Sequence, residues 1–154
     1  MKLIHLGPAS PQNLPNLRFR PAPADRLLEL AALLPLLANG IYVLVQYRRL
    51  GDALPSDCYS LLLTALLLFL LLFGAGYLPL NSINFPFRLK PHTVARQYVL
   101  ALRFCRAINI VLSLMFFFAT LAVFHPWADA ARAGCLVLLI AVFAGYFCLA
   151  WRAR

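Results

Sequence analysis

The polar residues inside the apolar stretches of this chain are its first candidates for chemistry, and the most deeply placed ones are neutral. Asn109, Ser113 and Thr120 fall within about 40° of one another at about 100° per helical residue, so one helix face carries all three. Side chains of this kind form hydrogen bonds between membrane helices, each contributing about 0.6–2 kcal/mol. We therefore predict interhelical polar packing at five positions: Asn39, Thr64, Asn109, Ser113 and Thr120.

The same polar face of the stretch 104–124 permits a second interpretation, a path for a substrate or for protons. Pumps and proton relays place ionisable groups near the bilayer centre. No such group stands in the middle of an apolar stretch here. Glu29 lies near the start of the first apolar stretch, and we expect it to form an interfacial ion pair with the neighbouring Arg26.

Motifs for catalysis or metal binding are missing from the sequence. The four cysteines form no Cys-x-x-Cys pair and match no zinc spacing. There is no Ser/His/Asp arrangement with supporting context, no phosphate-binding loop and no carboxylate pair within an apolar stretch. The sequence therefore predicts a protein that is not an enzyme and that needs no metal and no cofactor. Whether Cys58 and Cys135 form a disulfide or remain free thiols stays open.

A basic segment lies between the second and third apolar stretches. Its cations are Arg88, Lys90, Arg96, Arg103 and Arg106. The last three fall on one helical face, with Tyr98 on the opposite face, directed toward lipid or a neighbouring helix. Cations at a helix end reach lipid phosphates and anchor the helix, so anionic headgroups are the expected partner. The alternative is a docking site for an anionic ligand or another protein.

Four apolar stretches must position these residues. Hydrophobic residues make up 63% of the 154 residues and charged residues 12%, whereas a soluble domain is about a quarter charged. Stretches of about 20 apolar residues match a hydrocarbon core of about 30 Å. The sequence predicts an all-α, four-helix integral membrane bundle with helices at 27–46, 59–78, 104–124 and 134–151. A Pro-rich extended arm, 1–26, precedes them, and the long loop is 79–103.

The distribution of Lys and Arg predicts the orientation of the four helices. Of the 14 such residues, all but Arg48, Arg49 and Arg132 fall on the side that carries both termini. The positive-inside rule places that side in the cytoplasm, in a multi-pass membrane protein. The net charge of +9 is thus a topology signal, and we do not expect nucleic acid as a partner.

Small residues mark one face of the last apolar stretch. They are Gly134, Ala141, Gly145 and Cys148. Small residues allow helix backbones to approach closely. We expect this face to pack within the bundle, with homodimerisation as the alternative.

The residues Ile83–Leu89 and Ala95–Ala101 resemble a stretch of an uncharacterised family of small bacterial integral-membrane domains. That family is distantly related to the SdpI-type immunity proteins. The similarity covers 81–107. It implies a protein of the bacterial inner (plasma) membrane with unknown activity, and no catalytic residues come with it. The small size, the minimal loops, the packing faces and the missing catalytic motifs favour a structural or accessory subunit that packs against other membrane proteins. The alternative is a transporter or channel component that uses the polar face of the third helix.

Overall fold

The computed structural model describes residues 21–80, 83 and 93–152. In these residues the protein is all-helical, with four long helices and no strand. The helices are α1 (Pro23–Leu50), α2 (Ser56–Ala75), α3 (Val94–Ala122) and α4 (Trp127–Arg152), with a 3₁₀ turn, η1 (Gly51–Ala53), after α1. All four are long and apolar enough to cross a membrane, as expected of a multi-pass membrane protein.

Helix α1 begins earlier than the sequence predicts. Pro23 stands in its first turn, where the missing N–H costs no hydrogen bond. Asp25 accepts a hydrogen bond from the backbone N–H of Ala22 at 2.9 Å, which satisfies a donor at the helix start. The expectation that the extended arm reaches residue 26 is therefore wrong, and residues 1–20 of that arm lie outside the described part. The helix ends at Leu50, and the φ of 55° at its C-cap, Gly51, suits glycine.

The other helix bounds also depart from the predicted ones. Helix α3 begins at Val94 rather than at residue 104, and α4 begins at Trp127 rather than at 134. The predicted bounds followed apolar composition, but a helix continues into polar sequence as long as no breaker interrupts it. Helix α2 ends at Ala75 instead of 78, because Gly74, Gly76 and Pro79 disfavour further helical turns.

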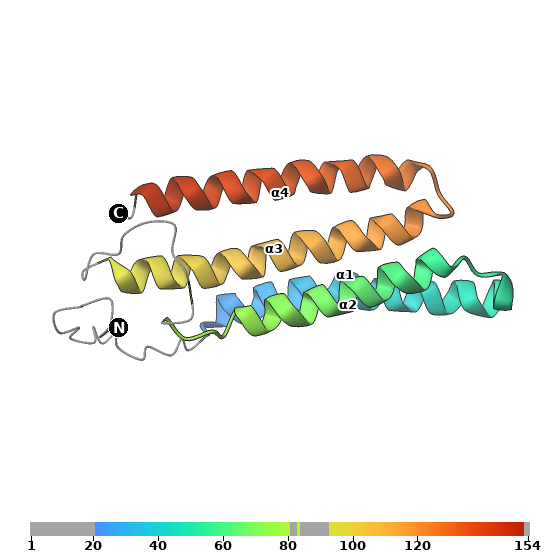
Figure 1. The fold of residues 1–154 in the computed structure, drawn as a ribbon, viewed down its shortest axis with the longest axis horizontal. Coiled ribbons are helices and arrows are strands. Elements are labelled where there is room, and N and C mark those ends of the chain that lie inside the picture. The colour runs from blue at the N-terminus through green and yellow to red at the C-terminus, as the bar shows by residue number, and fades with distance from the viewer. Residues whose placement is uncertain (1–20, 81–82, 84–92, 153–154) are drawn as a thin grey trace.

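Helix α3 is the centre of the bundle. It packs along α1, α2 and α4, whereas α4 packs mainly along α3 (Figure 1). The start of α1 and the end of α4 lie at the same end of the molecule (Figure 1). We call this the terminal end and the opposite one the loop end. Short connections make α1 and α2, and likewise α3 and α4, antiparallel. Helices α1 and α3 both begin at the terminal end, so they run parallel (Figure 1).

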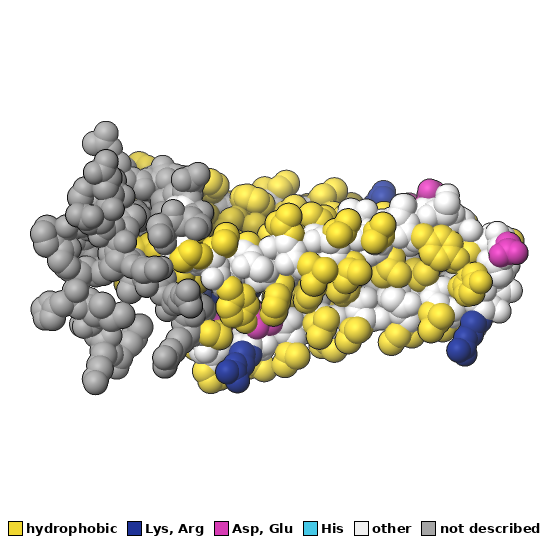
Figure 2. Space-filling view, turned by 60° about the horizontal axis from the view of Figure 1, so that its bottom comes forward, with side chains coloured by type: hydrophobic (Ala, Val, Ile, Leu, Met, Phe, Trp, Pro, Cys, Tyr) yellow, Lys and Arg dark blue, Asp and Glu magenta, His cyan; other side chains and the backbone are white. Residues whose placement is uncertain are grey.

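Among the described residues, two apolar clusters lie between α1, α2 and α3. One joins Ala32, Leu36, Ala65 and Phe69 with the flanking Leu33, Ile110 and Phe116. The other, nearer the loop end, joins Val43, Leu54 and Cys58 with the flanking Leu62 and Phe124. The face shown in Figure 2 carries apolar side chains along its length, with charged side chains near the two ends. Exposed apolar side chains such as Ile140 suit contact with the hydrocarbon of a bilayer.

Candidate functional site: an ion-pair cluster at the terminal end

An arginine within the bundle organises the terminal end. The side chain of Arg106 on α3 is only 3% exposed, and its Nε donates to Glu29 Oε1 on α1 at 2.9 Å. The Tyr77 hydroxyl donates to both carboxylate oxygens of Glu29, at 2.9 and 3.0 Å. The Arg106 guanidinium also lies over the Tyr77 ring, 5.5 Å from its centroid. These three residues and Gly76 form what we call the Arg106 cluster.

Arg106 also caps helix α2. Its Nη2 donates to the carbonyl oxygen of Gly76 at 3.3 Å, and its Nη1 donates to Leu102 O within α3 at 3.3 Å. The C-terminal end of a helix carries partial negative charge and unpaired carbonyl groups, so a cation stabilises it there. A Cβ on Gly76 would stand 3.2 Å from Phe73 O and 3.6 Å from Arg106 Cζ. The tight contact is the one with Phe73 O, so glycine suits the turn that ends α2, while the contact with the guanidinium would be of ordinary length.

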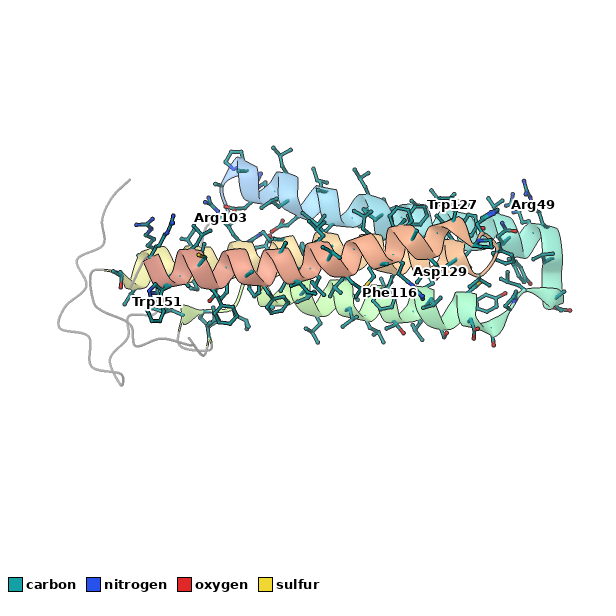
Figure 3. All side chains as sticks on the ribbon, turned by 90° about the horizontal axis from the view of Figure 1, so that it is seen from above. Arg49, Arg103, Phe116, Trp127, Asp129 and Trp151 are labelled. Atoms are coloured by element: carbon teal, nitrogen blue, oxygen red, sulfur yellow. The ribbon has the colours of Figure 1, made fainter. Side chains whose placement is uncertain are left out.

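A second ion pair stands one turn away. Arg103 Nε lies 3.0 Å from Asp25 Oδ1. Asp25 is fully buried, whereas the Arg103 side chain is half exposed, and it lies near the terminal end (Figure 3). Asp25 and Glu29 are four residues apart on α1, and Arg103 and Arg106 are three apart on α3. Because the two helices run parallel, these spacings place the two ion pairs one above the other along the helix axes.

The formal charges of the two ion pairs balance. Glu29 and Asp25 meet Arg106 and Arg103, so each buried charge has a partner. Partial burial, and then the hydrogen bond to Glu29, raise the pKa of the Tyr77 hydroxyl. This hydroxyl therefore remains a donor at neutral pH. The arrangement ties α1, the end of α2 and α3 together, and every nitrogen of Arg106 already donates to protein.

The sequence missed the partner of Glu29. The expected pair with Arg26 is wrong, because Glu29 binds Arg106 and Tyr77 instead. A usable signal was present in the sequence. Glu29 and Arg106 each stand at the third position of their predicted stretches, 27–46 and 104–124. Opposite charges at equal depth on parallel helices can meet.

The predicted basic face divides into separate groups. Arg88 and Lys90 lie outside the described residues, and Arg96 and Arg103 are exposed. Arg106 differs from the expectation, because it is buried and does not reach the membrane surface. Its helix position turns it toward α1 and α2, where Glu29 compensates its charge.

Tyr98 points toward the chain that follows α2 and not toward lipid. Its ring is 3% exposed, and its hydroxyl donates to the carbonyl oxygen of Leu78 at 2.7 Å. This bond fixes the start of α3 against the segment after α2. It thus adds one more polar contact to the terminal end.

The five neutral polar residues predicted to pack between helices behave in different ways. Asn109 Nδ2 donates to Phe69 O on α2 at 3.4 Å, an interhelical bond of the expected kind. Thr64 is exposed and donates to Ser60 O in its own helix, so it does not link helices in the predicted manner. Thr120 is buried and donates to Phe116 O, also within its own helix. Ser113 and Asn39 are buried on α3 and α1.

The small-residue face of α4 does not pack inside the bundle. Gly134, Ala141, Gly145 and Cys148 are all exposed. A Cβ added at Gly134 or at Gly145 would meet nothing within 4 Å. Helix α4 instead turns Ala128, Cys135 and Ala150 inward. The expected use of that face for close packing within the bundle is therefore wrong.

Aromatic side chains hold α4 on α3. The Phe104 ring stacks on Tyr146 with centroids 4.2 Å apart and meets Phe143 edge-to-face at 5.0 Å. Trp151 lies toward the terminal end and Trp127 at the loop end (Figure 3), and both are exposed. Exposed tryptophans near both helix ends fit the interfacial belts of a membrane span.

The cysteines and acidic residues add no further site to the described part of the chain. Cys58 and Cys135 are both buried free thiols, so they form no bridge with each other. Within the described ranges, no group of three or more His, Cys, Asp or Glu side chains is placed to hold a metal ion. No protein-family model, curated protein or solved structure matches this chain.

Proposed function

We propose that the protein is a non-enzymatic accessory subunit of a membrane protein assembly, and that the exposed small-residue face of α4 docks on its partner. The observation that carries this proposal is the open face at Gly134 and Gly145, on a helix that has one main neighbour. Between membrane helices, association depends on close van der Waals packing, which small residues allow. The Arg106 cluster, by contrast, is internally satisfied and serves to hold α1, α2 and α3 together.

Photo-crosslinking in native membranes tests this proposal. A photoreactive residue at Val137, which is 68% exposed beside the small-residue face, is compared with one at Ile41 on α1, which is 63% exposed. We expect a discrete adduct with a different protein from Val137 and only lipid adducts from Ile41. The substitution Gly145→Leu should abolish the protein adduct, whereas Ala133→Leu, on another side of α4, should preserve it.

Three results would contradict the docking role. They are a Val137 probe that captures no protein, equal capture from Ile41, or an adduct made only of two copies of this chain. The last result would replace the accessory role with homodimerisation.

We further propose that both termini face the cytoplasm of a bacterial cell, with the bundle in the plasma membrane. The excess of Lys and Arg on the side of the termini supports this orientation, and the resemblance over 81–107 supports the bacterial source. Cysteines introduced at Arg88 and Arg154, in a background without native cysteines, should react only with reagents that reach the cytoplasm. Reaction of either from outside the cell would overturn the orientation.

Anionic lipid headgroups are the proposed partner of the terminal end. Arg96 and Arg152 are exposed there, on the antiparallel helices α3 and α4. Each such cation contributes about 1 kcal/mol near an anionic leaflet. Native mass spectrometry should show fewer phosphatidylglycerol adducts for Arg96→Gln/Arg152→Gln than for the unchanged protein. Equal numbers of lipid adducts for the two proteins would contradict the binding of anionic lipid at this surface.

A transporter or channel component is the second candidate function, and one observation favours it. Asn109 Oδ1 is buried and finds no hydrogen-bond partner among the described residues, so a polar acceptor remains on the inward face of α3. The apolar cluster that contains Leu36 and Phe69 lies beside this position. Solute flux in proteoliposomes that falls with Ser113→Leu would support this candidate over the accessory role.

A further inference from the structure

Two polar side chains in the loop-end half of the bundle remain unsatisfied. Asn39 is 0% exposed, and neither its Nδ2 nor its Oδ1 has a hydrogen-bond partner among the described residues. The Tyr42 hydroxyl is also buried and has no hydrogen-bond partner among the described residues. Burying an amide without a hydrogen bond is costly, and in lipid no bulk water relieves that cost.

These two residues lie on one side of α1. Positions three apart on a helix are neighbours. The Tyr42 ring meets Phe124, which follows the end of α3, edge-to-face with centroids 6.2 Å apart. Since α1 and α3 run parallel, this contact and the Glu29–Arg106 pair bracket the stretch of α3 that lies level with Asn39. By interpolation Asn39 lies level with residues 116–121 of α3.

Thr120 on α3 falls within that level. It is 0% exposed and lies on the same helical face as Arg106, Asn109 and Ser113, the face that α3 turns toward α1 and α2. Its hydroxyl donates to Phe116 O, and its oxygen can still accept a hydrogen bond. The side chain of Thr120 is small, so it leaves more room at this level than a large apolar residue would.

Apolar clusters enclose this level on both sides along the helix axis. Leu36, three residues before Asn39, belongs to the cluster with Phe69. Val43, four residues after Asn39, belongs to the cluster with Leu54 and Cys58. The polar groups of Asn39, Tyr42 and Thr120 therefore form an enclosed polar level. They do not belong to a continuous polar path through the bundle.

We propose that Asn39 and Tyr42 bind ordered water between α1 and α3, with Thr120 as a third contact. Water donates and accepts, so it satisfies the amide N–H, the amide oxygen and the phenol hydroxyl together. Buried water typically makes about three hydrogen bonds to otherwise unpaired groups. The site goes beyond the proposed docking function, because it lies between α1 and α3 and away from the exposed face of α4.

Radiolytic labelling in ¹⁸O-water tests the site in detergent-solubilised full-length protein. Bound water converts to hydroxyl radical in place and oxidises adjacent side chains. We expect ¹⁸O incorporation at Tyr42 and little at Phe69, which lies in the apolar cluster. The substitution Asn39→Leu should lower incorporation at Tyr42 at least tenfold. No ¹⁸O at Tyr42, or equal ¹⁸O in both proteins, overturns the proposal.

A second measurement on the unchanged protein covers the case in which Asn39→Leu fails to fold. With ¹⁵N-asparagine labelling, magnetisation transfer from water to the Asn39 side-chain amide should give a cross-peak at the water frequency. The Asn39 signal is assigned by its loss in Asn39→Gln. A resolved Asn39 amide without a water cross-peak overturns the proposal.

Discussion

The three-helix part of the molecule, α1 to α3, and the fourth helix are held in different ways. Polar contacts tie α1, α2 and α3 together at the terminal end, where Arg106 contacts both other helices. Helix α4 contacts α3 through the Phe104 aromatic group and small inward residues. In lipid the hydrophobic effect does not distinguish a helix neighbour from an acyl chain. Directed polar bonds therefore define the three-helix core, while α4 keeps an outward face for other contacts.

Loss of Arg106 should have the largest effect on this contrast. Arg106→Met leaves Glu29 without its cation and Gly76 O without its donor, so we expect a loss of about 3–5 kcal/mol. Thermal or denaturant unfolding in detergent micelles measures it. Arg96→Met, at an exposed arginine of the same helix, is the matched control and should cost clearly less. If Glu29→Gln in the Arg106→Met protein restores part of the stability, the loss comes from the uncompensated carboxylate. Equal losses of stability for the two arginine variants would contradict the special role of Arg106.

Removal of the Phe104 ring should affect α4 alone. Phe104→Ala deletes the contacts with Tyr146 and Phe143, and aromatic pairs contribute about 0.5–1.5 kcal/mol each beyond their burial. We expect faster backbone hydrogen exchange in α4 and unchanged exchange in α1 and α2. If exchange increased equally in all helices, α4 would belong to the same cooperative unit as the other three.

The interhelical bond of Asn109 should have a smaller effect. Asn109→Leu removes the bond to Phe69 O and also the unpartnered Oδ1. Bonds of this kind contribute about 0.6 kcal/mol on average and up to about 1.7, so we expect a loss near 1 kcal/mol or less. The unfolding midpoint in micelles measures it. A gain in stability would show that the unpartnered oxygen outweighs the bond.

The smallest effect is expected at Thr64. Its hydroxyl bonds to Ser60 O within α2 and its side chain is exposed, so Thr64→Val should change stability by less than about 0.5 kcal/mol. The same unfolding assay provides the measurement. A loss as large as that of Asn109→Leu would restore Thr64 as an interhelical contact.

Composition and hydropathy sufficed to predict the class of fold. Four apolar stretches of membrane-spanning length leave helices as the arrangement that satisfies the backbone in lipid, and four such helices are present. The helix ends were less predictable, because Val94 and Trp127 begin helical turns in sequence that is not continuously apolar. Local helix-forming tendency extends past the hydrocarbon region, where hydropathy gives no signal.

What the sequence determined by itself is therefore the set of spans and the depth of each polar residue along its own span. Only the tertiary structure decided which helix each residue faces. Glu29 meets Arg106 and not the adjacent Arg26, because α1 and α3 are parallel neighbours with matching depths. The small residues of α4 face outward, because the register of α4 on α3 is fixed instead by Phe104 and by Ala128, Cys135 and Ala150. Rotation about a helix axis leaves the hydropathy of a membrane span unchanged, so packing between helices must set it.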